Sequence, residues 1–199
     1  MPQRFTLGLD LGQQNDFTAT VIVEREAQAG RPREPLLSVR HLERVRGVPY
    51  PKIVEATDAL LSQHPLRNQT AFVIDRTGVG VAVTDMFVAA GLKPIGVTIH
   101  GGDTVNGNDR DGYRVPKREL VGSLQSALQS GRLKIAASLP LADALVKEAL
   151  NFRVTIDPRT AHDSYAAWRE DDHDDLILAT AMAVWHAQRV IPSRQLVTF

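Results

Sequence analysis

Residues 5–23 read FTLGLDLGQQNDFTATVIV, two apolar runs joined by a short polar turn. The first run ends at Gly12, and the second, residues 17–23, is rich in β-branched side chains, which is typical of two strands with a tight connection. One carboxylate, Asp10, stands inside the first run. Because a buried carboxylate costs several kcal/mol unless it is paired or bound to a metal ion, we expect Asp10 to have a compensating partner.

Outward from this strand pair, helices and strands are predicted to alternate. The pattern predicts a Gly/Pro/Arg loop over 27–35, strands over 36–45, 70–75, 93–99 and 132–136, and helices over 51–62, 79–90, 116–130, 141–151 and 174–190. Residues 100–112 are rich in Gly, Asp and Asn and are predicted to form a mobile loop. Three antiparallel strands followed by strand–helix units predict an α/β fold with a mixed five-stranded sheet, three strands antiparallel and then two parallel, flanked by helices.

Length and composition restrict the possible classes of protein. The 199 residues suggest one domain, residues 1–190, with residues 191–199 as a tail. There is no cysteine, which excludes disulfides, thiolate nucleophiles and cysteine-based metal sites. No apolar run is long enough to span a membrane and no signal peptide is recognisable, so we expect a cytoplasmic protein without a membrane partner.

Further carboxylates stand at the ends of predicted elements. Asp75 ends the strand of residues 70–75, and Asp174 and Asp175 begin the last helix. Each has an ordinary explanation: Asp10 as a turn cap, Asp75 as an ion-pair partner of Arg76, and Asp174 as an N-cap. Together they also suit hard cations such as Mg²⁺ or Mn²⁺, two of which can promote phosphodiester hydrolysis.

Four stretches carry a resemblance to a known family. They are GLDLGQQNDFTAT (8–20), VIDRTGVG (73–80), YRVPKRELVGSLQSALQSGRLKI (113–135) and HDDLILATAMAVW (173–185). These stretches resemble the nuclease domain of tailed-phage large terminase subunits, which have a ribonuclease H-like fold and cut concatemeric DNA during head packaging. The resemblance implies a metal-dependent endonuclease that cleaves double-stranded DNA with two divalent cations, Mg²⁺ or Mn²⁺.

The resemblance also implies roles for individual residues. Asp10 would bridge both metal ions, Asp75 would bind one ion and Asp175 the other, with Asp174 as an alternative or auxiliary ligand. Asp16 and His173 are weaker auxiliary candidates, since Asp16 also suits a turn cap and His173 an exposed loop.

Basic residues concentrate between positions 110 and 134, where six stand against two acidic residues. Four of them are candidate phosphate contacts for DNA: Arg114, Lys117, Arg118 and Lys134. The alternative explanation is a solvated helix face, because charged helix faces are common.

Other functions remain open from the sequence. A Holliday-junction resolvase or another ribonuclease H-like nuclease would have the same fold, whereas a single ATP-binding lobe would use Asp10–Gly12 and Thr77–Gly80 for phosphate. A non-catalytic assembly module of the packaging machine is a further alternative. The 199 residues contain no G-x-x-x-x-G-K-[ST] phosphate loop, so this chain is not expected to pump DNA by itself. The resemblance to large terminase subunits implies a packaging ATPase, a portal or a small terminase subunit as a partner.

Overall fold

The computed structural model describes residues 3–13, 16–151 and 174–189. His173 and the expected tail, residues 191–199, lie outside the described residues. No helix in the described ranges is long and apolar enough to cross a membrane.

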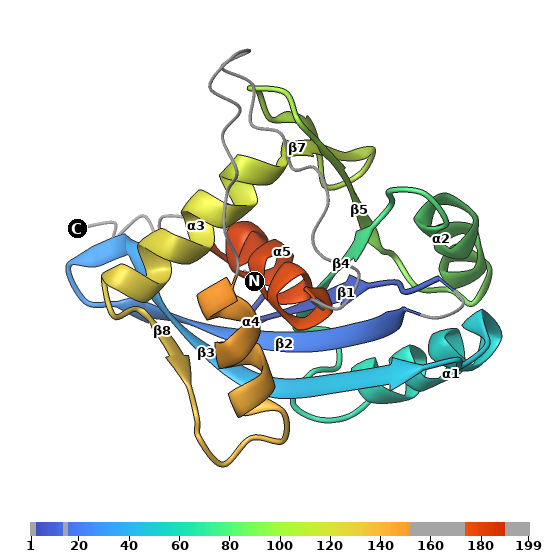
Figure 1. Cartoon of the computed structure of the whole chain (residues 1–199), viewed down its shortest axis with the longest axis horizontal. Coiled ribbons are helices and arrows are strands. Elements are labelled where there is room, and N and C mark those ends of the chain that lie inside the picture. Colours follow the sequence, from blue (N-terminus) through green and yellow to red (C-terminus); the bar gives the residue numbers. More distant parts are fainter. Residues whose placement is uncertain (1–2, 14–15, 152–173, 190–199) are drawn as a thin grey trace, which may run out of the picture.

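A single mixed sheet forms the centre of the structure, with the strand order β6-β7-β5-β4-β1-β2-β3-β8 (Figure 1). Its strands are β1 (Phe5–Asp10), β2 (Phe17–Gln28), β3 (Arg31–Arg46), β4 (Thr70–Asp75), β5 (Ile95–His100), β6 (Asn106–Asn108), β7 (Gly112–Pro116) and β8 (Leu133–Ile135). Strands β1, β2 and β3 are antiparallel, and β4 and β5 add to β1 in parallel. The α/β fold with a mixed sheet is therefore confirmed.

The sheet is wider than the expected five strands, since β7 and β6 extend one edge and β8 the other. The predicted mobile loop over 100–112 is wrong in part: Asn106–Asn108 pairs with β7, because backbone groups form a ladder whatever the side chains are. The predicted loop over 27–35 is also mostly strand. Gly30, with a φ of 75°, provides a tight turn, so β2 and β3 continue on either side of it.

Within the described residues, five helices cover the two faces of the sheet. They are α1 (Tyr50–Leu61), α2 (Gly80–Ala89), α3 (Lys117–Gln129), α4 (Ala142–Asn151) and α5 (Asp175–Arg189). The first core lies between one face and the helices α3, α4 and α5, and the second core lies between the other face and α1 and α2. Figure 1 shows α5 crossing the sheet between α3 and α4.

Helix α5 packs very closely on β1. A Cβ atom at Gly8 would overlap the carbonyl oxygen of Ala179 and would lie 3.2 Å from the Cβ of Ala183. Only a glycine in β1 and small residues in α5 allow this approach.

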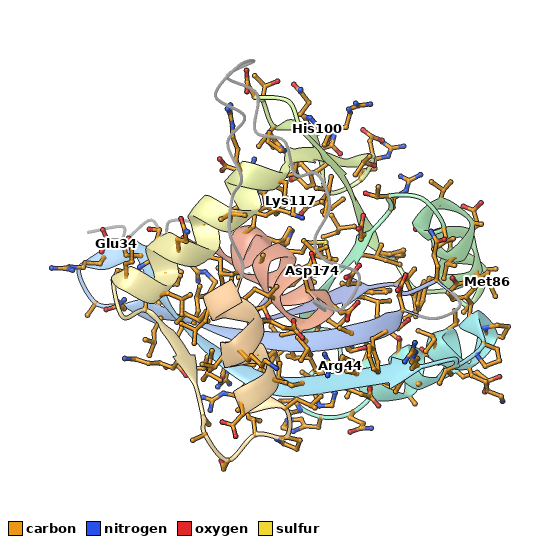
Figure 2. All side chains as sticks on the ribbon, viewed as in Figure 1. Glu34, Arg44, Met86, His100, Lys117 and Asp174 are labelled. Atoms are coloured by element: carbon orange, nitrogen blue, oxygen red, sulfur yellow. The ribbon has the colours of Figure 1, made fainter. Side chains whose placement is uncertain are left out.

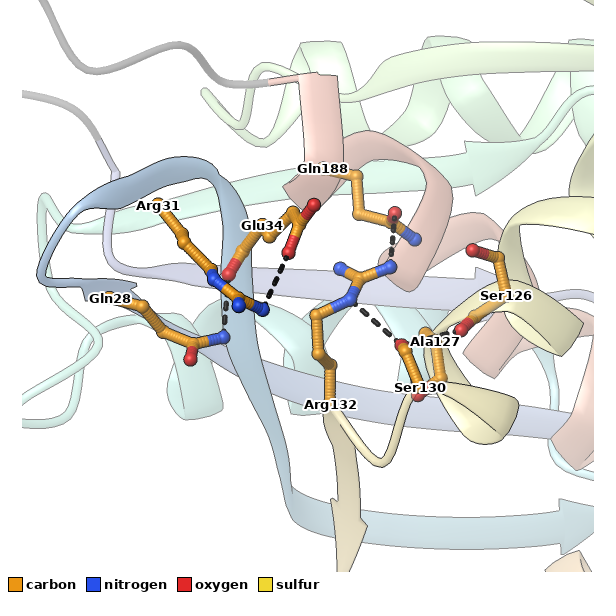
Figure 3. Close-up of polar contacts among 8 residues, drawn as sticks. All are labelled: Gln28, Arg31, Glu34, Ser126, Ala127, Ser130, Arg132 and Gln188. Carbon is orange, nitrogen blue, oxygen red and sulfur yellow. Dashed lines mark hydrogen bonds and ion pairs between the residues drawn. The ribbon is translucent and has the colours of Figure 1, made fainter.

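The C-terminal end of α5 is held by two arginines from other elements. Arg25 donates from Nε to the carbonyl oxygen of Ala187 at 3.1 Å. Arg132, which follows α3, reaches Oε1 of Gln188 at 3.4 Å and also donates to Oγ of Ser130 (Figure 3). The same view shows the β2–β3 turn, where Gln28 donates to the carbonyl oxygen of Glu34. The close contact at Gly8 and the two arginines at the C-terminal end together fix the position of α5 on the sheet.

Replacing Gly8 with alanine is expected to lower the free energy of unfolding by about 1–3 kcal/mol, because the added methyl group meets backbone atoms that cannot move aside cheaply. Denaturant unfolding measures this change. Gly122→Ala in α3 is the matched control: nothing lies within 4 Å of its Cβ position, and the substitution should stabilise by about 0.5–1 kcal/mol. Equal effects of the two substitutions would contradict the close packing at Gly8.

Candidate active site

The ends of β1, β4 and α5 bring the predicted acidic residues to one place. Strands β1 and β4 are parallel with Leu9 opposite Ile74, so Asp10 and Asp75 follow at the same end of both strands. Side chains alternate along a strand, and Val73 belongs to the first core, which places Asp75 on the face that α5 covers. Helix α5 begins at this end.

Asp10 is the centre of the group. Burial and then the negative charges of Asp75, Asp175 and Asp174, in that order, raise the pKa of Asp10 well above its ordinary value. Lys117 acts in the opposite direction. The charges of three carboxylates from two other segments therefore act on the Asp10 carboxylate. The ammonium group of Lys117 is close enough to oppose their effect on its pKa.

Asp75 is partly buried and is held by the turn that follows it. Its Oδ1 accepts a hydrogen bond of 2.7 Å from the backbone N–H of Thr77. Burial raises the pKa of Asp75, while the hydrogen bonds of Thr77 and the charge of Lys117 oppose the shift. The ordinary explanation of Asp75 as a partner of Arg76 is wrong, because Asp75 lies on the α5 side of the sheet and the side chain of Arg76 lies on Gly96, on the other side.

Lys117 and Asp174 lie where α3 and α5 begin (Figure 2). The Nζ atom of Lys117 is 3.8 Å from Oδ2 of Asp174, and both side chains are partly covered. Asp175, the first residue of α5, is only 8% exposed. A buried carboxylate at a helix N-terminus is favoured by the positive end of the helix dipole.

Sequence reasoning missed Glu148, a residue of α4 that lies beside this site. Its Oε2 accepts a hydrogen bond of 2.9 Å from the backbone N–H of Ile177, in the first turn of α5. Its Oε1 accepts one of 2.8 Å from Arg44 of β3, whose guanidinium stacks over the ring of Phe17. Both charged side chains of this pair are largely buried. Glu148 thus caps the N-terminus of α5 although it belongs to another helix. A contact between such distant segments leaves no local sequence pattern from which it could be predicted.

Glu148 is unusually hard to ionise. Burial raises its pKa from 4.5 to about 7, against the lowering by the Ile177 N–H and the Arg44 charge, and the charge of Asp175 adds to the increase.

The remaining predicted site residues are spread over the molecule. Asp16 is exposed in the β1–β2 turn, where its N–H donates to the carbonyl oxygen of Gln13. Arg114 is exposed on β7, and Arg118 pairs with Asp103 at 2.7 Å. Lys134 is on β8, at the opposite edge of the sheet from β7, so the four predicted DNA contacts do not form one continuous patch.

The chemistry of the four carboxylates suits a divalent cation. Hard cations prefer oxygen ligands, and a cation would neutralise the mutual repulsion that raises the pKa of Asp10. Among the described residues, no three His, Asp or Glu side chains already converge closely enough to enclose an ion. Asp10, Asp75, Asp174 and Asp175 are therefore neighbouring donors that would have to turn toward a bound ion.

Comparison with solved structures shows which proteins share this fold. The large terminase nuclease of thermophilic phage G20c is 17% identical to this chain with a TM-score of 0.58, and the match covers 91% of this chain and 81% of that one. The manganese-soaked terminase nuclease domain of human cytomegalovirus is 17% identical with a TM-score of 0.51, covering 92% of this chain and 82% of that one. The predicted ribonuclease H-like fold of terminase nucleases is thereby confirmed.

A longer protein matches as well. The large terminase of bacteriophage HK97 is 17% identical with a TM-score of 0.56; 94% of this chain matches 40% of that chain. No protein-family model matches the sequence, and no curated protein does.

The raised pKa of Glu148 predicts a specific pH dependence of stability. Between about pH 4.5 and about pH 7, folded Glu148 holds a proton that the unfolded chain releases, so raising the pH through this range removes about 2–3 kcal/mol of stability. Glu148→Gln keeps an acceptor for Ile177 but cannot ionise. We expect the free energy of unfolding, measured in EDTA, to fall more steeply with pH in the wild type than in this variant. Parallel curves would contradict the raised pKa.

Proposed function

We propose that this chain is a metal-dependent endonuclease that cleaves double-stranded DNA by two-metal-ion hydrolysis of a phosphodiester bond. The observation that carries the proposal is the group around Asp10, whose pKa is raised by burial and by three other carboxylates. Such a concentration of negative charge destabilises the protein unless it serves to bind something positive.

The fold and the metals of similar proteins support this assignment. Solved structures that share the fold are described as terminase nucleases, and the G20c nuclease has been solved with bound zinc and with bound cobalt. The cytomegalovirus domain was soaked with manganese. For this chain we propose Mg²⁺ or Mn²⁺, because its donors are carboxylate oxygens.

Each carboxylate has a proposed role. Asp10 would contribute ligands to both cations, Asp75 would hold one and Asp175 the other, with Asp174 as an auxiliary ligand. When bound, such cations lower the pKa of water and stabilise the charge that develops on the phosphate oxygens. The charge of Lys117 opposes the increase in the pKa of Asp10 and of Asp75, and so favours the carboxylate form that binds cations.

The proposed biological role rests on the same comparison with solved terminase structures. We propose that the chain acts in phage DNA packaging, in the cytoplasm of a bacterial host, together with a packaging ATPase, a portal or a small terminase subunit. Support comes from the HK97 large terminase, of which this chain matches a 40% portion.

Cleavage of supercoiled plasmid in Mg²⁺, Mn²⁺ or EDTA tests the activity. We expect metal-dependent nicking and linearisation by the wild type. Asp10→Asn, Asp75→Asn and Asp175→Asn should each lower the rate by at least about a hundredfold, since loss of an outer-shell partner alone costs roughly 10–100-fold. Asp58→Asn, at an exposed position of α1, is the matched control and should cut normally. An inert wild type, or three variants as active as the wild type, would refute the proposal.

Metal binding has a readout that does not depend on cleavage. In EDTA near neutral pH, Asp10→Asn should melt at a higher temperature than the wild type, because the amide removes a buried charge repelled by its neighbours. Added Mn²⁺ should raise the melting temperature of the wild type more than that of the variant, since only ligands that bind the folded state stabilise it. Equal shifts in both proteins would show that Asp10 does not hold the ion.

A further inference from the structure

Strands β5, β7 and β6 carry a polar face that neither core includes. Their other face is apolar, with Val97 of β5 and Val115 of β7 in the first core. The buried residues of the second core come from β1, β2, β4, α1, α2 and adjacent loops, and none comes from β5, β6 or β7. The alternating residues on the uncovered side are Thr98 on β5, Arg114 on β7 and Asn106 on β6, which lie opposite one another in the pairing.

Arg76 extends across this same face. It directly follows Asp75, and its backbone N–H continues the sheet by donating to the carbonyl oxygen of Val97. Its side chain lies flat on Gly96 of β5, where a Cβ atom would overlap Cδ of Arg76. Its Nη1 reaches β7, 3.4 Å from the Cβ position of Gly112. Two glycines in neighbouring strands therefore leave the space that this arginine occupies.

The charge of this face is not compensated within the described residues. Arg4, Arg40, Arg44 and Arg118 each form an ion pair with a carboxylate, whereas Arg76 and Arg114 form none there. The buried Nε of Arg76 has no hydrogen-bond partner in the structure. Strands β5, β6 and β7 contain no acidic residue. Of the two acids in the turn between β6 and β7, Asp111 accepts a hydrogen bond from Asn108 and Asp109 accepts one from the hydroxyl of Tyr113.

We propose that this surface, the arginine face formed by Arg76, Thr98, Asn106 and Arg114, binds the sugar–phosphate backbone of DNA outside the carboxylate site. The inference rests on the proposed function, because it assigns a second contact to the same substrate. Planar guanidinium groups bind phosphate oxygens with paired hydrogen bonds, and the threonine and asparagine side chains add neutral donors. Neighbouring strands are about 4.8 Å apart, so a face from β4 to β6 spans about 14 Å, enough for more than one phosphate of a strand.

The location fits a DNA strand that also reaches the carboxylates. Asp75 and Arg76 are consecutive residues at the end of β4, one on each face of the sheet. DNA bound at this end can therefore meet the acidic group on one side and the arginine face on the other. An acidic protein surface is the competing occupant, and the test separates the two.

Salt-dependent binding of a labelled DNA duplex of about 30 base pairs, followed by fluorescence anisotropy in EDTA, tests the arginine face. In the Arg76→Met/Arg114→Met protein, the slope of log affinity against log salt concentration should fall in magnitude by about 2, because each phosphate contact contributes roughly 0.9. Affinity at about 150 mM salt should fall roughly tenfold or more. Arg114→Met alone, at an exposed position that does not affect packing, should lower the slope by about 1.

The matched control is Arg67→Met/Lys147→Met, which removes the same charge from exposed positions after α1 and on α4. Its slope should stay close to that of the wild type. Equal slopes for both double variants, or a wild type that binds no DNA, would overturn the inference. Plasmid cleavage decides the proposed function separately: normal cutting with an unchanged slope refutes only the arginine face, and a lowered slope without cutting refutes only the nuclease.

Discussion

The close approach of α5 to β1 at Gly8 is the contact on which the acidic group depends. From Ala179 back to Asp175, α5 rises about 6 Å, and from Gly8 forward to Asp10 the strand advances about 6.6 Å. The two elements cross at Gly8 and Ala179. Because these two distances are nearly equal and both lead toward the same end of the sheet, Asp175 lies near Asp10. If the helix were held further from the strand, the two carboxylates would be separated.

Charged groups from other elements hold both ends of α5, and their signs match the helix dipole. Glu148 accepts from an N–H of the first turn, and Arg25 donates to a carbonyl of the last turn. This arrangement allows a helix to start with two carboxylates beside a third, although their repulsion opposes it. The energy of that repulsion is tolerated because the two cores fix the helix and the strands independently of the acidic group.

Local patterns predicted the elements that have a clear hydrophobic period. The strand Thr70–Asp75 and the helices of the two cores occur where the sequence placed them. The charges of Asp75, Asp174 and Asp175 act on Asp10, while their roles as metal ligands stay a prediction. What the sequence could not reveal depends on pairing between distant segments. Strand β6 has no apolar side chain and exists through its ladder with β7, and Glu148 gains its role only when α4 meets α5.

The dipeptide Asp75–Arg76 shows how one local pattern can hide two opposite environments. In the sequence, a carboxylate beside a guanidinium suggests an ion pair, and that pair would have cancelled both charges. The alternation of a strand instead sends Asp75 toward Asp10 and Arg76 across Gly96 on the other face. The sheet thus separates a negative and a positive charge by its own thickness. A polyanion that needs cations at its scissile bond and basic side chains along its backbone would find both at this end of β4.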